Sequence, residues 1–369
     1  MTERLTWDQV RAWRLARQRL IERGPVLEPV ISEVCGFHAQ VTSSAELHAW
    51  ARVEGVRPQD VRDALWVRRS LVRTWCMRGT LHLLAAADLP LYVAALRTQS
   101  RWFRGAWLRW VGLTADELRE LAQATHDALS DVPLTREQLA AKVAERIGLR
   151  ARDHLLSGWG MMLKPAAFQG SLISGPPRGQ SVTFVRPQSW LETWEEPSVE
   201  LAWREIVRRY LRVYGPANHR DFGIWWGMQA GPAGKVLKAS AGELVEVDVE
   251  GYRGWLNAED LPELRKTPPT TPTRLLPAFD VYTIGNRQRV SLVEEAFADR
   301  VFRQAGWISP VVVARGLIVG VWSHRLNGGR LEVRVQPFRP LTAGQKKEIA
   351  REARRLGEFL EAPAAVSYS

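Results

Sequence analysis

One stretch indicates the fold first: Leu71-Val72-Arg73-Thr74-Trp75-Cys76-Met77-Arg78-Gly79-Thr80-Leu81-His82-Leu83-Leu84. Its two arms, residues 71–77 and 80–84, are rich in the aliphatic, β-branched and aromatic side chains that favour β-strands. Arg78-Gly79 lies between the arms, where glycine permits the backbone angles of a tight turn. The stretch therefore predicts a β-hairpin.

Helical patterns precede this hairpin. Thr6-Trp7-Asp8-Gln9 is a capping box, which marks the start of a helix. Thr42-Ser43-Ser44 has the side chains of an N-cap for a later helix that begins near Ala45. Helices followed by a hairpin form the winged-helix pattern, in which the hairpin is the wing. The helices are expected over residues 7–23, 27–34, 45–53 and 58–69.

The same order of elements returns twice along the chain, although the repeats share little sequence. The sequence thus predicts an α+β protein of three tandem winged-helix units, covering residues 1–112, 113–192 and 193–369. The third unit is expected to carry a β-rich C-terminal extension. Its strands are predicted over residues 275–282, 307–313, 317–322 and 331–335, followed by a closing helix over 342–360.

Composition limits the classes of function. The chain has 369 residues, of which 46% are hydrophobic and 25% charged, as in soluble globular proteins of more than one domain. Its net charge of +11 favours a polyanionic partner, nucleic acid before membrane. The N-terminal sequence lacks a secretory pattern and no apolar window is long enough to span a bilayer, so we expect a cytoplasmic protein without a membrane partner.

Arginine is concentrated around the predicted hairpin. Between Trp66 and Trp110 the chain has eight arginines and one acidic residue, Asp88. Such a stretch could follow a sugar-phosphate backbone, with Arg73 and Arg78 of the hairpin at phosphates. The alternative for residues 97–109 is the solvated face of an amphipathic helix.

A second notable stretch, residues 36–44, lies between two helical patterns. Alternation predicts that His38 and Gln40 lie on one face of an extended segment while Ala39 points inward. The two polar side chains are candidate catalytic groups. The alternative is a polar loop without a chemical role.

Several common catalytic patterns are missing from the sequence. The histidines and two cysteines never fall at metal-ligand spacing, and Gly231 to Lys235 only superficially resembles a phosphate loop. Cys35 lies close to His38, but a buried structural cysteine explains it more simply than a nucleophile does. We therefore expect neither a metal nor a nucleotide cofactor.

Several segments together resemble the winged-helix DNA glycosylase family of AlkZ and YcaQ. The resemblance covers nearly the whole chain and keeps the order of the motifs. The matching segments are residues 36–40, 73–84, Tyr214-Gly215-Pro216-Ala217, Leu276-Pro277-Ala278-Phe279-Asp280 and Gly285-Asn286-Arg287.

The resemblance implies candidate residues for catalysis and DNA binding. The family has Gln-x-Gln or Gln-x-Asp at its catalytic motif, so Gln40 matches the second position and His38 replaces the first glutamine. Candidate DNA-binding residues are Arg73, Arg78, Thr80, His82 and Arg287.

The implied activity is that of a monofunctional DNA glycosylase, which hydrolyses the N-glycosidic bond of purines alkylated at N7 or N3. The lesions could be bulky or crosslinked, and the role would be repair of alkylation damage or self-resistance to a toxin. The expected partner is double-stranded DNA that contains alkylated purines, bound by a monomer. One alternative is a winged-helix regulator without catalytic activity. Another is a relative with an inactive site that binds RNA or protein.

Overall fold

We analysed a computed structural model that describes residues 3–156, 160–269, 271–285 and 291–369. The chain divides into two compact units, of which the larger combines Met1–Val61 with Val207–Ser369 and the smaller is Arg62–Ile206. These limits do not coincide with the boundaries expected after residues 112 and 192. The division into three tandem winged-helix units therefore stays a prediction.

The larger unit combines helices and strands from both ends of the chain. Its helices are α1 (Trp7–Arg17), α2 (Leu27–Glu33), α3 (Thr42–Arg52), α13 (His219–Trp226), α14 (Ala230–Ala239), α15 (Leu261–Lys266), α16 (Val281–Gly285), α17 (Ala298–Val301) and α18 (Ala343–Phe359). Helices α4 (Pro58–Trp66) and α12 (Val199–Tyr214) cross its limits. Its strands are β1 (Glu3–Leu5), β2 (Phe37–His38), β8 (Leu244–Val249), β9 (Tyr252–Asn257), β10 (Arg274–Leu276), β11 (Val311–Ala314), β12 (Leu317–Asn327), β13 (Arg330–Pro337) and β14 (Ala364–Tyr368).

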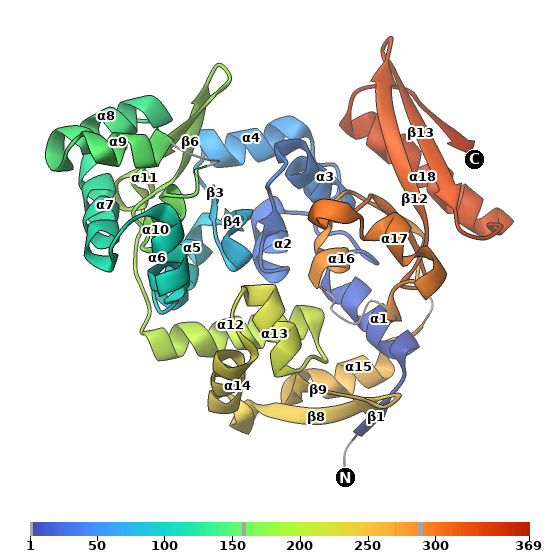
Figure 1. Cartoon of the computed structure of the whole chain (residues 1–369). Coiled ribbons are helices and arrows are strands. Elements are labelled where there is room, and N and C mark those ends of the chain that lie inside the picture. The colour runs from blue at the N-terminus through green and yellow to red at the C-terminus, as the bar shows by residue number, and fades with distance from the viewer. Residues whose placement is uncertain (1–2, 157–159, 270, 286–290) are drawn as a thin grey trace. The chain divides into compact units, whose positions relative to one another are not determined.

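A five-stranded sheet in the order β10-β11-β12-β13-β14 forms the C-terminal part of this unit. Its pairs are antiparallel except for the last, in which β14 runs parallel to β13. Strand β13 alternates exposed and buried residues, as a half-buried strand does. Helix α18 lies beside this sheet (Figure 1), and its buried residues form one hydrophobic core with those of β13 and with Trp50 of α3. Helix α3 therefore begins near the candidate catalytic loop and ends on this core.

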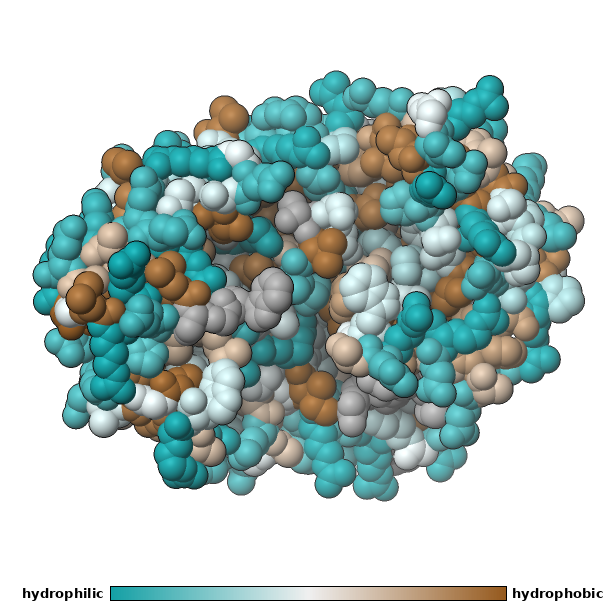
Figure 2. Space-filling view, turned by 45° about the horizontal axis from the view of Figure 1, so that its top comes forward, coloured by the Kyte–Doolittle hydropathy of each residue, from teal (hydrophilic) through white to brown (hydrophobic). Residues whose placement is uncertain are grey.

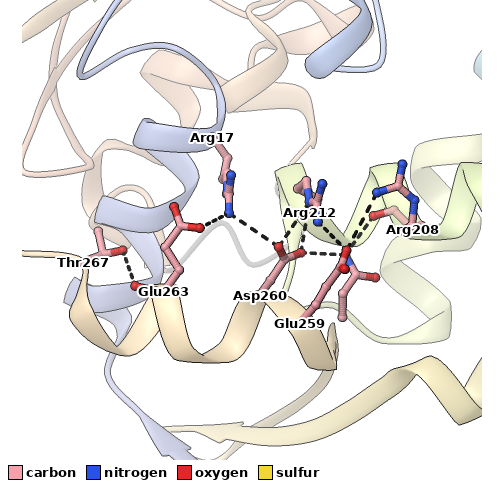
Figure 3. A network of polar contacts seen from close by, with 8 residues as sticks. Arg17, Arg208, Arg212, Glu259, Asp260, Glu263 and Thr267 are labelled. Atoms are coloured by element: carbon pink, nitrogen blue, oxygen red, sulfur yellow. Dashed lines mark hydrogen bonds and ion pairs between the residues drawn. The ribbon is translucent and has the colours of Figure 1, made fainter.

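Ion pairs hold the separate segments of the larger unit together. Glu352 of α18 is fully buried and accepts hydrogen bonds from Arg23 at 2.6 and 2.8 Å. A second network joins α1, α12 and α15 (Figure 3), in which Asp260 contacts Arg17 at 3.5 Å and Arg212 at 3.2 Å. Such pairing satisfies carboxylates that would be costly to bury alone.

The smaller unit contains two hairpins among helices. Strands β3 (Leu71–Trp75) and β4 (Leu81–Ala85) pair antiparallel, and a second sheet has the order β5-β7-β6, from β5 (Leu134–Thr135), β6 (Ile173–Arg178) and β7 (Ser181–Val185). The helices are α5 (Leu89–Leu96), α6 (Gly105–Val111), α7 (Ala115–Ala128), α8 (Arg136–Ile147), α9 (Leu149–Leu156), α10 (Leu163–Phe168) and α11 (Pro187–Trp190). The order from α7 to β7 is consistent with a winged helix.

Two predictions about the N-terminal helices need correction. Helix α1 ends at Arg17 rather than near residue 23, because Arg19 has a φ of 57°, which no right-handed helix accommodates. The proposed N-cap at Thr42-Ser43-Ser44 was wrong, since α3 already begins at Thr42 and Val41 is its N-cap residue. The hydroxyl of Ser44 donates instead to the carbonyl oxygen of Ala278.

The C-terminal predictions were partly right. The strand expected over residues 275–282 was wrong, because β10 ends at Leu276 and α16 begins at Val281. Pro277 lacks the N–H that a strand would donate, and Phe279 has a left-handed φ of 58°. The closing helix is confirmed as α18.

Within the described residues, no helix is long and apolar enough to cross a membrane. Hydrophilic residues predominate on the face shown in Figure 2, and the hydrophobic residues there form small separate groups.

Candidate active-site loop and DNA-binding hairpin

The candidate catalytic loop is extended over two residues only, Phe37 and His38 of β2. Ala39 is 1% exposed, as the alternation predicted. His38 is also buried, with 6% of its surface exposed, whereas Gln40 is exposed. Gln40 lies in a bend, so the extended segment ends before it, and another ring covers the imidazole of His38.

That ring belongs to Phe279. The imidazole of His38 stacks on it with ring centroids 5.1 Å apart and planes inclined by 25°. Phe279 also contacts Trp307, whose ring lies edge-on with its centroid 5.0 Å away. Three aromatic rings from three distant segments thus extend from the candidate loop to the surface, where the Trp307 side chain is 45% exposed.

Phe279 keeps its place because both neighbouring residues are held. The carbonyl oxygen of Ala278 accepts the hydrogen bond from Ser44, while Asp280 receives two hydrogen bonds of 2.7 Å from Arg52. The Asp280 carboxylate also accepts from the backbone N–H of Tyr282 at 2.9 Å. These contacts with α3 and α16 hold Phe279 in a left-handed conformation that a bulky residue rarely adopts.

The Arg52–Asp280 pair is fully buried and lies beside His48. Burial by itself raises the pKa of Asp280, but the charge and hydrogen bonds of Arg52 outweigh it and the pKa stays below its ordinary value. Burial lowers the pKa of His48 to about 4, and the charge of Arg52 acts in the same direction. His48 is therefore neutral at physiological pH, even though its Nε2 lies 4.0 Å from Asp280.

Two other motifs of the sequence support the loop from a different side. The Tyr214 hydroxyl donates to the carbonyl oxygen of Val34 at 3.1 Å, immediately before the loop. Gly285 packs so closely on this tyrosine that an added Cβ would lie 2.2 Å from the ring. The Tyr214 and Gly285 motifs thus fix the chain that leads into the loop.

In the smaller unit, the hairpin predicted over residues 71–84 is confirmed. Leu71 pairs with Ala85 and Trp75 with Leu81, so β3 and β4 are in register along their whole length. At the tip, Arg78 has a φ of 59° and is partly exposed. This places one guanidinium group at the end of the hairpin.

His82 supports Arg78 instead of facing solvent. It is 2% exposed, and its Nε2 lies 3.2 Å from an Arg78 Nη. Its Nδ1 lies 2.9 Å from the carbonyl oxygen of Thr80. Since a guanidinium can only donate and a carbonyl can only accept, these contacts fit a neutral imidazole protonated at Nδ1.

The remaining candidate DNA-binding residues differ in their surroundings. Arg73 is partly exposed on β3, and burial lowers its pKa. The Thr80 hydroxyl donates to the carbonyl oxygen of Met77 at 3.2 Å and so helps to close the turn. Arg287 lies outside the described residues. The hairpin therefore brings together Arg73, Arg78, Thr80 and His82, and Arg78 is the residue at its tip.

Among the described residues, no group of three or more His, Cys, Asp or Glu side chains is arranged to hold a metal ion. Cys35 and Cys76 are buried and form no disulfide. Burial raises the pKa of the Cys76 thiol to about 12, which is the opposite of what a reactive thiolate needs.

Comparison with known proteins identifies the class of enzyme to which this fold and loop belong. A family profile described as AlkZ-like DNA glycosylase matches residues 31–359. The chain belongs to this family and is a DNA glycosylase, which favours an enzyme over the non-catalytic regulator.

Two individual comparisons agree with the family. The chain is 38% identical over 326 residues to the interstrand DNA cross-link repair glycosylase of Streptomyces sahachiroi. The aligned region covers 86% of this chain and 87% of that protein. The chain is also similar to the solved structure of the Streptomyces sahachiroi DNA glycosylase AlkZ, with a TM-score of 0.90 and 33% identity over 99% of this chain and 100% of the other.

Sequence reasoning assigned no role to Phe279 or Trp307, and it assigned Ser44 to an N-cap instead of the hydrogen bond to Ala278. Phe279 lies in one of the motifs that carry the family resemblance. This position indicated that the residue matters, but it did not indicate the stacking on His38. The pairing of Phe279 with His38 depends on a long-range contact that no local pattern encodes.

Proposed function

We propose that this DNA glycosylase releases purines alkylated at N7 or N3 from double-stranded DNA, using Gln40 and His38 to activate water. The observation that carries the proposal is the His38-Ala39-Gln40 loop, because it occupies the family's catalytic motif and is held by contacts from the family's other motifs. Exposed Gln40 is the residue of this loop that substrate and water can reach most directly.

The chemistry asks little of the protein. Alkylation at N7 or N3 gives the purine a positive charge, so the bond from the sugar C1′ to the base breaks readily and its electrons neutralise the departing purine. The sugar then has oxocarbenium character. A monofunctional enzyme must stabilise this sugar and hold a water molecule beneath it.

Gln40 and His38 have different tasks in this proposal. The Gln40 side-chain oxygen accepts a hydrogen bond from the water. This contact directs a lone pair of the water oxygen at C1′. The His38 imidazole accepts the proton that the water loses. Stacking on Phe279 limits the ring to one plane, which favours a fixed direction for this proton transfer.

The β3–β4 hairpin is the proposed contact with the DNA backbone. Arg78 at the tip has the charge and the donors for a phosphate, and neutral His82 orients it. Arg73, Thr80 and Arg287 remain candidate contacts to the same DNA. The chain binds as a monomer through three winged-helix units, without a metal or nucleotide cofactor.

We further propose that the lesions include bulky or crosslinked adducts. The printed name of the relative from Streptomyces sahachiroi, an interstrand DNA cross-link repair glycosylase, supports this extension. Repair of such adducts would protect a cell from an alkylating toxin.

The direct test is to incubate the protein with duplex DNA containing N7-methylguanine and to measure the free base. Release of intact N7-methylguanine, with an abasic site and no strand break, is expected. Strand cleavage coupled to base release would contradict a monofunctional enzyme. Absence of release from both methylated and bulky-adduct DNA would contradict the proposed substrate class.

A further inference from the structure

A hollow of about 650 Å³ opens beside Trp307 in the larger unit. Its volume lies within the range of small-molecule binding pockets. Neither water activation nor the hairpin contact uses it. The lining side chains are two aromatic rings, an acid, a base and an amide, namely Trp307, Phe302, Asp299, Arg303 and Gln304.

The loop that carries Trp307 is closed by its own backbone. The Arg303 N–H donates to the carbonyl oxygen of Trp307 at 2.8 Å, and Phe302 forms an isolated bridge with Ile308. Ala305 turns the chain with a φ of 55°, a conformation that a residue with a Cβ seldom adopts. The indole is therefore presented by a defined turn, and a ligand can stack on it with little loss of freedom.

One aromatic ring separates this hollow from the candidate catalytic residue. The Trp307 ring meets the edge of Phe279, and Phe279 stacks on His38. A substituent attached to a purine at the catalytic loop can therefore extend past Phe279 to the exposed indole. A methyl group on the purine is too small to fill such a hollow.

We infer that the hollow binds the non-purine part of a bulky lesion, and that this part is a flat aromatic group with N–H or O–H donors. Trp307 and Phe302 offer ring faces and edges for stacking. Asp299 and Gln304 offer oxygen acceptors for the donors. The inference rests on the proposed function and adds the source of selectivity for large adducts.

The test measures binding separately from chemistry. A chain with Gln40→Ala is titrated by fluorescence anisotropy with two duplexes, one containing an N7-guanine adduct of a hydroxylated polycyclic aromatic and the other containing N7-methylguanine. We expect the bulky-adduct duplex to bind about tenfold more tightly, the scale of one aromatic stacking contact. Trp307→Ala should remove most of this preference, Trp307→Phe should keep most of it, and Asp299→Asn should reduce it.

Matched controls lie elsewhere in the chain. Tyr368→Ala removes an aromatic side chain that is 40% exposed, and Asp131→Asn neutralises an exposed acid. Both should keep the preference. Equal affinity for the two duplexes in the chain with native Trp307 would overturn the inference. An equal loss of affinity for both duplexes in the Trp307→Ala chain would overturn it as well.

Base release by the chain with native Gln40 is measured on the same duplexes. A preference that depends on Trp307, without base release, would support the hollow and contradict the proposed function. Base release without such a preference would support the proposed function and contradict the role of the hollow.

Discussion

The imidazole ring of His38 lies against the phenyl ring of Phe279, with centroids 5.1 Å apart and planes within 25° of parallel. The contact joins the candidate catalytic loop to a segment near the C-terminal sheet. The phenyl ring covers one face of the imidazole. Ser44 and Arg52 of α3 fix the position of Phe279, because they hydrogen-bond to its neighbours Ala278 and Asp280. Positioning of His38 thus depends on residues that need not touch DNA.

The first prediction concerns this contact. Phe279→Ala should lower single-turnover base release about tenfold or more, because a misplaced catalytic group costs much of its effect. Phe279→Tyr keeps a ring and should retain most of the rate. A structural role alone would change both variants only in melting temperature. Base release is therefore measured well below the melting temperature of each variant, and an unchanged rate in folded Phe279→Ala would contradict the positioning role.

The second prediction concerns the buried ion pair. Asp280→Asn leaves the Arg52 guanidinium buried without its counter-charge, so the free energy of unfolding should fall by about 3 to 5 kcal/mol. Glu263→Gln removes an acid from a partly exposed pair with Arg17 and should change it by at most about 1 kcal/mol. Urea unfolding of both variants measures the contrast. Equal losses would show that the Arg52–Asp280 pair does not anchor the fold.

The third prediction follows from the depressed pKa of His48. The folded state keeps this histidine neutral down to about pH 4, whereas an unfolded chain protonates it at an ordinary pKa of about 6.5. Between these pH values the unfolded state binds more protons, so the free energy of unfolding should rise with pH. The contribution of His48 should be fully present above pH 6.5 and lost as pH falls toward 4.

The measurement is urea unfolding across this pH range. At about 1.4 kcal/mol per pKa unit, the change due to His48 is on the order of 3 kcal/mol. His48→Gln cannot titrate and should show a flatter profile over the same range. Identical profiles for the two chains would refute the assignment to His48. Protonation of Asp280 adds a further loss only at lower pH, since its pKa is also depressed.

Local features of the fold could be predicted from the sequence, whereas long-range contacts could not. The β3–β4 hairpin and the capping box at Thr6 were predicted correctly, because each is encoded by neighbouring residues. Strand β14 was missed, since it follows the closing helix and pairs in parallel with β13. Its existence depends on the sheet that it joins.

The same distinction between local features and long-range contacts applies to the candidate site. His38 and Gln40 were chosen from sequence, and the structure places them in one short loop. Burial of His38 could not be predicted, because it depends on the left-handed backbone of Phe279 and on the partners of Asp280. Likewise, the buried position of His82 shows only once β4 is folded.

The fourth prediction concerns DNA binding by the hairpin. Arg78→Ala should weaken binding to duplex DNA about equally for all sequences, and it should reduce the slope of log K against log salt by about 1. Arg315 provides a control, since Arg315→Ala removes a charge outside the hairpin. Anisotropy titrations at several salt concentrations measure both slopes. An Arg78→Ala chain with an unaltered slope would exclude a phosphate contact at Arg78.

The proposed function depends on Gln40 and His38, which together would activate the water that releases the base. The most direct measurement is single-turnover release of N7-methylguanine from duplex DNA by the native chain and by Gln40→Ala, His38→Ala and His38→Gln, with melting temperatures taken on the same samples. Gln40→Ala should slow release by about 10² to 10³ without a comparable loss of DNA affinity. His38→Ala should also impair release, while His38→Gln, which restores the family residue, should retain activity and lose any fall in rate caused by protonation of the imidazole. Full activity in a folded Gln40→Ala chain would contradict the catalytic role of this loop.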